Sequence, residues 1–135
     1  MRELVGSLSI RDRVPQIEFA VGEDANQPGT TQIALVIRHL LPLTPTDLKN
    51  LESFAKHHQI GIWLQPQGPE TAKPFCPSEQ SLSYTLPEFG VTLPFLPTDF
   101  TQVNHAVNQV LISKAIALLD IQASDRMIDL FCAIS

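Results

Sequence analysis

Two segments near the C-terminal end combine polar and apolar side chains in a way that could hold a ligand. The first, residues 99–104 (Asp-Phe-Thr-Gln-Val-Asn), places amides and a carboxylate beside Phe100 where a helix is expected to begin. Such side chains either satisfy the free N–H groups of a helix start or hydrogen-bond a ligand in a cleft. The second, Met127 to Cys132, is an apolar run that contains Asp129. Because a lone buried charge is unfavourable, Asp129 requires a partner or a functional role.

The histidines are weaker candidates. His57 and His58 are adjacent at the expected end of a helix, where a cation complements the helix dipole. No cysteine or carboxylate stands at metal-ligand spacing from them, so a solvated helix end is favoured over a metal site. His39 and His105 stand alone in the sequence. Isolated histidines are more often structural than catalytic, and we expect both to be structural.

The two cysteines, Cys76 and Cys132, lie far apart without a paired spacing. This excludes a small disulfide scaffold and gives no zinc signature. Cys76 precedes a proline in an expected loop, and no neighbouring base is identifiable that would activate it as a nucleophile. We therefore expect Cys76 to be unreactive.

The composition describes a globular, acidic domain. The chain has 135 residues, 44% of them hydrophobic and 17% charged, and a net charge of −5. Its nine basic residues are scattered, and only Arg11 and Arg13 lie close together. Proteins that bind DNA or RNA usually cluster Lys and Arg. The charge pattern therefore predicts no DNA partner and no independent grip on RNA.

Neither a secretory leader nor a membrane-spanning run is visible. The first residues lack a cationic region followed by a long apolar stretch, and no apolar run approaches the ~18 residues that cross a bilayer. We expect a cytoplasmic protein with no membrane partner.

The first residues predict a helix followed by a hairpin. Residues 2–10 have leucines at helical spacing, and 16–21 and 32–39 predict two antiparallel strands joined by the turn-rich segment 23–30. In the first strand, alternate apolar side chains share one face: Ile17, Phe19 and Val21.

Thr44 marks the clearest helix start. Thr44 can cap, Pro45 suits the first helical position, and Asp47 completes a capping-box-like pair. Apolar residues follow at spacings of three and four, and residues 60–64 then predict a short buried strand. We expect the face that carries Asp47 and Glu52 to be an ordinary solvated helix surface.

The second half predicts a loop, a hairpin and a helix. Residues 65–81, rich in Pro, Gly and polar side chains, predict an exposed loop, and 82–86 with 91–95 predict a second hairpin. Apolar periodicity over 103–119 predicts a helix, and Met127–Cys132 predicts a strand. Because a strand rarely ends a domain without a partner, the pattern suggests truncation.

The predicted fold class is α+β. Residues 1–96 form a small mixed or antiparallel sheet with helices, and a Pro-rich corner near Pro97 separates them from the helix and strand of a second unit, residues 97–135. A strand at Met127–Cys132 without a partner would expose unpaired backbone groups that can pair with another chain, so we expect the chain to self-associate.

Residues 99–104 with Asn108, followed by Asp129–Cys132 (Asp-Leu-Phe-Cys), resemble the bacterial RNA uracil-C5 methyltransferases, most closely the branch that modifies large-subunit ribosomal RNA. In that family a Phe-x-Gln-x-Asn segment leads a helix into the first strand of a Rossmann-like methyltransferase domain, ending Asp-Leu-Phe-Cys-Gly-x-Gly. The resemblance is specific over Leu93 to Cys132. Upstream, the chain is more loosely similar to the family's central RNA-binding α+β domain.

The resemblance implies a site for S-adenosylmethionine. Gln102 matches the glutamine that contacts the cofactor near the reacting centre, and Phe131 matches a residue that lines the cofactor site. Asp129 matches the acidic residue of the strand, which supports the site from behind. Asn104 and Asn108 match helix-start positions of structural importance.

The family's reaction is covalent. A cysteine thiolate attacks C6 of a flipped-out uracil, C5 takes the methyl group, and a carboxylate base removes the C5 proton. The resemblance places the nucleophile and base C-terminal to this chain and the iron–sulfur cysteines of the parent enzyme N-terminal to it. Neither Cys76 nor Cys132 therefore inherits these roles, and we expect no iron–sulfur cluster in this chain.

One departure from the family bears on activity. Ala133-Ile134-Ser135 stands where the family has Gly-x-Gly, whose glycines let the backbone approach the cofactor. The sequence therefore predicts an inactive fragment of a 23S ribosomal RNA uracil-C5 methyltransferase, with an incomplete cofactor site and with ribosomal RNA as partner through the parent enzyme. The alternative is a free-standing, non-catalytic α+β binding or interaction module, which the acidic charge and missing glycines favour.

Overall fold

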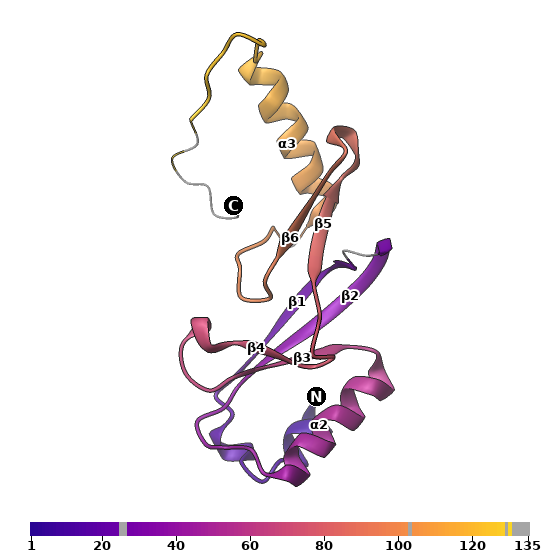
Figure 1. Ribbon diagram of the computed structural model, residues 1–135, viewed down its shortest axis with the longest axis vertical. Helices are drawn as coiled ribbons and strands as arrows, with labels where there is room; N and C mark the ends of the chain where they lie inside the picture. The colour runs from indigo at the N-terminus through magenta and orange to yellow at the C-terminus, as the bar shows by residue number, and fades with distance from the viewer. Residues whose placement is uncertain (25–26, 103, 129, 131–135) are drawn as a thin grey trace.

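The computed structural model describes residues 1–24, 27–102, 104–128 and 130. These residues form a mixed six-stranded sheet in the order β4-β3-β2-β1-β5-β6, three α-helices and three short 3-10 turns. In Figure 1, α2 and the N-terminus lie at one end of the molecule and α3 at the other. The predicted α+β class is confirmed.

The strands, in chain order, are β1 (Gln16–Asp24), β2 (Gln27–Arg38), β3 (Gly61–Gln65), β4 (Lys73–Cys76), β5 (Leu82–Leu86) and β6 (Val91–Phe95). The α-helices are α1 (Arg2–Gly6), α2 (Pro45–His58) and α3 (His105–Leu119). The 3-10 turns are η1 (Arg11–Arg13), η2 (Pro69–Thr71) and η3 (Pro87–Phe89). The helix expected over residues 2–10 thus ends at Gly6.

The β1–β2 hairpin is confirmed but longer than predicted. Antiparallel pairing runs from Gln16 opposite Arg38 to Asp24 opposite Gln27. Most of the segment 23–30 is therefore strand rather than turn. The pairing shifts register between Glu23 and Asp24, so the two strands continue past this irregularity into residues whose composition favours a turn.

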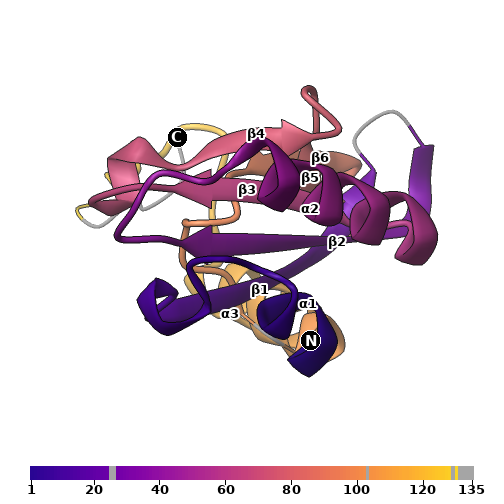
Figure 2. The ribbon, with the colours of Figure 1, turned by 90° about the horizontal axis from the view of Figure 1, so that it is seen from below.

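β2 is the central strand and is buried on both faces. Leu35 and Ile37 pack toward α1 and α2, whereas Ala34 and Val36 pack on the opposite face with Trp63 of β3. Burial on two faces explains why residues 33–37 of this strand form an unbroken apolar run rather than an alternating one. β3 pairs with β2 in parallel through the crossover helix α2. Figure 2 shows α2 in front of β2 and β3, and α1 in front of β1.

The start of α2 is tied to the N-terminal segment by a buried carboxylate. The capping box is confirmed: the Asp47 N–H donates to the Thr44 hydroxyl, and the Thr44 N–H donates to the Asp47 carboxylate. The expectation that Asp47 is solvated is wrong, because its exposed fraction is 1%. The Ser9 N–H and hydroxyl both donate to Asp47 at 2.7 Å. Glu52 does stay exposed and pairs with Lys56 at 2.6 Å.

The segment 65–81 contains a strand that the sequence did not predict. β4 pairs antiparallel with β3, after the turn η2. A short edge strand in a Pro-rich segment is specified by its neighbour rather than by its own composition.

The second predicted hairpin, β5–η3–β6, is confirmed. It joins the rest of the sheet where β5 pairs with β1 at Glu23 and Asp24.

The strand predicted at Met127–Cys132 is wrong for the residues that can be described. Met127, Ile128 and Leu130 lie outside any strand, while 129 and 131–132 fall outside the described residues. A strand needs a hydrogen-bonded neighbour, and sequence pattern alone does not supply one. Within the described ranges, no helix is long and apolar enough to cross a bilayer.

Candidate functional site

A groove of about 650 Å³ lies between β1 and the segment that connects β6 to α3. Figure 1 shows this connecting segment passing beside β1 before the chain reaches α3. The groove is lined by residues 18–22 of β1, Thr31 of β2, residues 97–102 and His105.

β1 gives the groove an open apolar wall. Ile17, Phe19 and Val21 share a face, as predicted, but Phe19 is 62% and Val21 48% exposed. The opposite side of the strand carries the buried Ala20 and Gly22. The sequence pattern places these larger side chains on one face but does not identify them as groove residues. The available signal was the small residues between them, because a sheet buries small residues where another segment packs closely.

The connecting segment is anchored at both ends. Phe95 is buried, and its ring packs so closely over Gly22 that a β-carbon there would lie 2.8 Å from the Phe95 Cζ. At the other end, the Val107 N–H donates to the Asn104 side chain at 3.1 Å, which makes Asn104 the N-cap of α3. This agrees with the structural role expected for Asn104.

Gln102, the first of the predicted cofactor residues, lies in this groove with an exposed side chain. Phe100, two residues earlier, is 76% exposed. The other two predicted residues, Asp129 and Phe131, lie outside the described residues. Gln102 is therefore the one predicted site residue that the structure places.

The groove can offer hydrogen bonds and aromatic faces. Among the described residues that line it, the carboxylates are Glu18 and Asp99, and none is Lys or Arg. Such a groove suits a neutral or cationic ligand better than a phosphate backbone, whose binding rests on cations.

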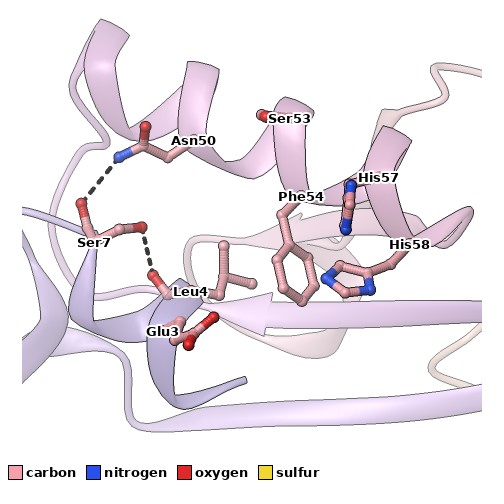
Figure 3. Close-up of a pocket in the computed structure, with 8 residues that line it drawn as sticks. All are labelled: Glu3, Leu4, Ser7, Asn50, Ser53, Phe54, His57 and His58. Carbon is pink, nitrogen blue, oxygen red and sulfur yellow. Dashed lines mark hydrogen bonds between the residues drawn. The ribbon is translucent and has the colours of Figure 1, made fainter.

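A second hollow, of about 290 Å³, lies between α1 and α2. Figure 3 shows the rings of Phe54, His57 and His58 at one end and Ser7 and Asn50 at the other. The Asn50 amide donates to the Ser7 carbonyl at 3.0 Å, which joins the two helices. The Phe54 and His58 ring centroids lie 4.3 Å apart. His57 and His58 end α2, as expected, and this hollow is a packed helix joint.

The remaining candidate residues have structural surroundings. His39 is 9% exposed, and its Nδ1 donates to the Leu41 carbonyl at 2.8 Å. Cys76 ends β4 and packs against the core cluster beneath α2. The His105 ring lies 6.5 Å from that of Tyr84. In the described part of the chain, no group of three or more His, Cys, Asp or Glu side chains could hold a metal ion.

Several known proteins that are similar to this chain share one description. No family model matches the chain. It is 58% identical over 134 residues to the 23S rRNA (uracil(1939)-C(5))-methyltransferase RlmD of Ralstonia pickettii, covering 99% of this chain and 28% of that protein. Proteins of the same description from Cupriavidus necator and Burkholderia cenocepacia are 57% and 53% identical over 134 residues. This chain is a homologue of one part of these enzymes.

The homology confirms the family resemblance read from residues 93–132 and extends it to nearly the whole chain. The match covers 99% of this chain in all three relatives, but 28%, 29% and 27% of their own lengths. The chain thus spans somewhat more than a quarter of the methyltransferases it matches. The looser upstream similarity is therefore homology as well.

Proposed function

We propose that this chain supplies the central α+β module, and the start of the S-adenosylmethionine domain, of a 23S ribosomal RNA uracil-C5 methyltransferase. The observation that carries the proposal is 58% identity over 134 residues to an enzyme described as such. The whole enzyme methylates a ribosomal uridine, and this chain by itself transfers no methyl group. Its placement is cytoplasmic, where ribosomal RNA is modified, with no DNA or membrane partner.

Two units make up the chain in this proposal, residues 1–96 and 97–135. The sheet ends at Phe95, and Pro97 follows two residues later. All of α3 is described, and none of its residues is buried although it carries one charged side chain, Lys114. A helix that is apolar on every side is normally covered by other elements. This supports α3 as the first helix of a Rossmann-like methyltransferase domain completed by other parts of the enzyme.

The methyl donor of the enzyme is S-adenosylmethionine, and Gln102 is its contact in this chain. The exposed Gln102 amide, beside the aromatic side chains of the groove, fits the polar and cationic methionine end of that cofactor. The groove is open, so the described residues supply one wall of a site rather than all of it. We also propose Phe131 as a residue that lines the cofactor site and Asp129 as a residue that supports it.

In the reaction that we propose for the whole enzyme, a cysteine thiolate attacks C6 of a uracil, and C5 takes the methyl group from the donor, which leaves S-adenosylhomocysteine. A carboxylate then removes the C5 proton, and the bond between the cysteine and C6 breaks as the C5–C6 double bond re-forms. The uridine is flipped out because a stacked base shields these atoms. Cys76 does not act as this nucleophile, because it packs against the core beneath α2. Any iron–sulfur cluster belongs to other parts of the enzyme. The part of the reaction that we assign to this chain is to shape the path by which RNA reaches the active site of the whole enzyme.

The test of the proposed activity compares this chain with the complete product of the gene that encodes it. Both are incubated with radiolabelled S-adenosylmethionine and 23S rRNA from cells that lack the C5 methyl group. We expect label in the rRNA with the complete product and none with the 135-residue chain. Absence of label with an intact, folded complete product would contradict the proposal.

The test of the cofactor contact is calorimetric titration with S-adenosylmethionine. We expect no high-affinity binding to the 135-residue chain and weaker binding to the Gln102→Ala form of the complete product than to its wild type. An unchanged affinity in Gln102→Ala would remove Gln102 from the site. High-affinity binding to the chain alone would show that the site is more complete than proposed.

The competing proposal is a free-standing α+β binding or interaction module without catalysis. The net charge of −5 and the acidic groove favour it. Reading the gene beyond Ser135 discriminates the two. A reading frame that continues into a Gly-x-Gly-like segment and a later cysteine motif supports the methyltransferase, whereas a stop codon supports the binding module.

A further inference from the structure

The four residues that follow β6 form a turn closed from two sides. The Asp99 N–H donates to the Leu96 carbonyl at 2.8 Å, and the Leu96 N–H donates to Oδ2 of Asp99 at 2.7 Å. Pro97, inside the turn, is buried. Asp99 thus fixes where the chain leaves β6.

The turn at Leu96–Asp99 lies just before Gln102 and restricts the backbone positions that Gln102 can adopt. Upstream, Phe95 is fixed over Gly22. Downstream, Asn104 caps α3. Residues 100–102 belong to no helix or strand, so their path across the groove is set by the anchors on either side. Removing the Asp99 anchor would let this short span move while leaving the sheet and α3 intact.

We propose that Asp99 is a positioning residue that holds Gln102 at the groove, acting through the turn rather than through its charge. The inference rests on the proposed role of Gln102 as a cofactor contact. Asp99 is partly exposed and lies outside both core clusters, so its loss affects the span more than the stability of the fold. Asn at this position keeps an Oδ1 acceptor for the Leu96 N–H and loses only the charge.

The first experiment measures the turn directly in the 135-residue chain. Amide hydrogen exchange over residues 96–102 is compared in wild type, Asp99→Ala and Asp99→Asn. We expect faster exchange in Asp99→Ala and near wild-type exchange in Asp99→Asn. The matched control is Thr71→Ala, which opens a similar Pro-containing turn: there the Gln67 N–H donates to the Thr71 hydroxyl at 3.1 Å, at the opposite edge of the sheet. Unchanged exchange in Asp99→Ala would overturn the proposal.

The second experiment measures the consequence for Gln102 in the complete gene product. We expect Asp99→Ala to weaken S-adenosylmethionine binding about five- to tenfold and to raise the KM for the cofactor while the KM for rRNA stays the same, because a misplaced contact loses affinity at that contact. Asp99→Asn should restore the wild-type Kd, and Thr71→Ala should not change it. Failure of Asp99→Asn to restore binding would overturn the proposal by showing that the charge is what matters.

A double-substitution cycle separates this inference from the function on which it rests. If Asp99 acts through Gln102, then Asp99→Ala has no further effect on the Kd in a Gln102→Ala background. An additive effect would overturn the proposal. If Gln102→Ala alone leaves the Kd unchanged, the cofactor contact itself is wrong and the inference falls with it. If Gln102→Ala weakens binding but Asp99→Ala does not, the contact stands and only the positioning role is wrong.

Discussion

Asp47 joins two parts of the chain that are far apart in the sequence. It accepts hydrogen bonds from the N–H and hydroxyl groups of both Ser9 and Thr44, at 2.7 to 2.8 Å. A buried carboxylate with four donors is stable because the hydrogen bonds replace the water that it has lost. Asp47 therefore does two things: it starts α2 and holds the N-terminal segment against the helix.

Replacing Asp47 tests this junction. Asp47→Asn presents an amide N–H₂ group to donors that need an acceptor, and we expect it to lower the free energy of unfolding by about 3 kcal/mol. The measurement is urea denaturation followed by circular dichroism. Glu52→Gln, on the exposed side of the same helix, is the control and should leave the midpoint near that of the wild type. Equal midpoints for the two variants would contradict the structural role of Asp47.

The same residue predicts an acid-dependent loss of stability. Burial alone would raise the pKa of Asp47, but the hydrogen bonds from Ser9 and Thr44 outweigh it and hold that pKa well below its usual range. A lowered folded-state pKa stabilises the fold fully above the unfolded-state pKa of about 3.9 and loses this contribution as pH falls through the folded-state value. The wild type should therefore lose stability below about pH 4 more steeply than Asp47→Asn. Parallel pH profiles of the two would contradict the assignment.

At the scale of elements, the contact between β1 and the β5–β6 hairpin depends on one glycine. A β-carbon at Gly22 would lie 2.8 Å from the Phe95 Cζ and 2.9 Å from the Ser83 carbonyl oxygen. The Thr85 hydroxyl strengthens the contact by donating to the Glu23 carboxylate at 2.9 Å. The hairpin carries the segment that forms one wall of the groove, so this contact determines the groove's width.

Gly22→Ala should weaken the contact. Because one of the close atoms is backbone and the other belongs to a buried ring, neither can move without cost, and we expect a loss of about 1–3 kcal/mol in the free energy of unfolding. Gly6→Ala is the matched control, since nothing lies within 4 Å of a β-carbon there and alanine favours the helix that Gly6 ends. Thermal unfolding compares them. If Gly22→Ala were as stable as Gly6→Ala, the β5–β6 hairpin would be able to move and accommodate the added β-carbon without loss of stability.

The two edge strands are protected against pairing with other chains. The edges of the sheet are β4 and β6, which contain Pro74 and Pro94. Proline cannot donate a ladder hydrogen bond and is one of the means by which edge strands avoid aggregation. We therefore expect self-association of this chain to use a surface other than the edges of the sheet.

At the scale of the whole molecule, that surface is α3. Its apolar side chains are exposed on several sides, among them Val107, Val110, Leu111, Leu118 and Leu119. Exposed apolar area of this extent marks an interaction surface or an aggregation risk. In the proposed enzyme it is covered by the rest of the methyltransferase domain, whereas the 135-residue chain leaves it open.

We expect the 135-residue chain to self-associate through α3 as its concentration rises. Leu111→Gln with Leu118→Gln should shift the sedimentation profile toward the monomer. The control is Leu40→Gln with Leu41→Gln, which removes two exposed leucines from the connection between β2 and α2. Equal sedimentation of the two double variants would show that α3 is not the contact surface.

The sequence by itself determined the features that depend on neighbouring residues. The capped helix from Thr44 and the β5–β6 hairpin follow from local capping and turn chemistry, and both are confirmed. The motif around Gln102 led to the methyltransferase family, and the homology confirms it. These features needed no knowledge of which distant segments meet.

Tertiary structure decided what depends on contacts between distant residues. The pairing of β4 with β3, the burial of Asp47 under Ser9, and the exposure of Phe19 and Val21 all depend on such contacts. Periodicity shows which side chains share a face but not whether another element covers that face. The groove beside Gln102 exists because Gly22 admits Phe95, and that closeness is visible only once the chain is folded.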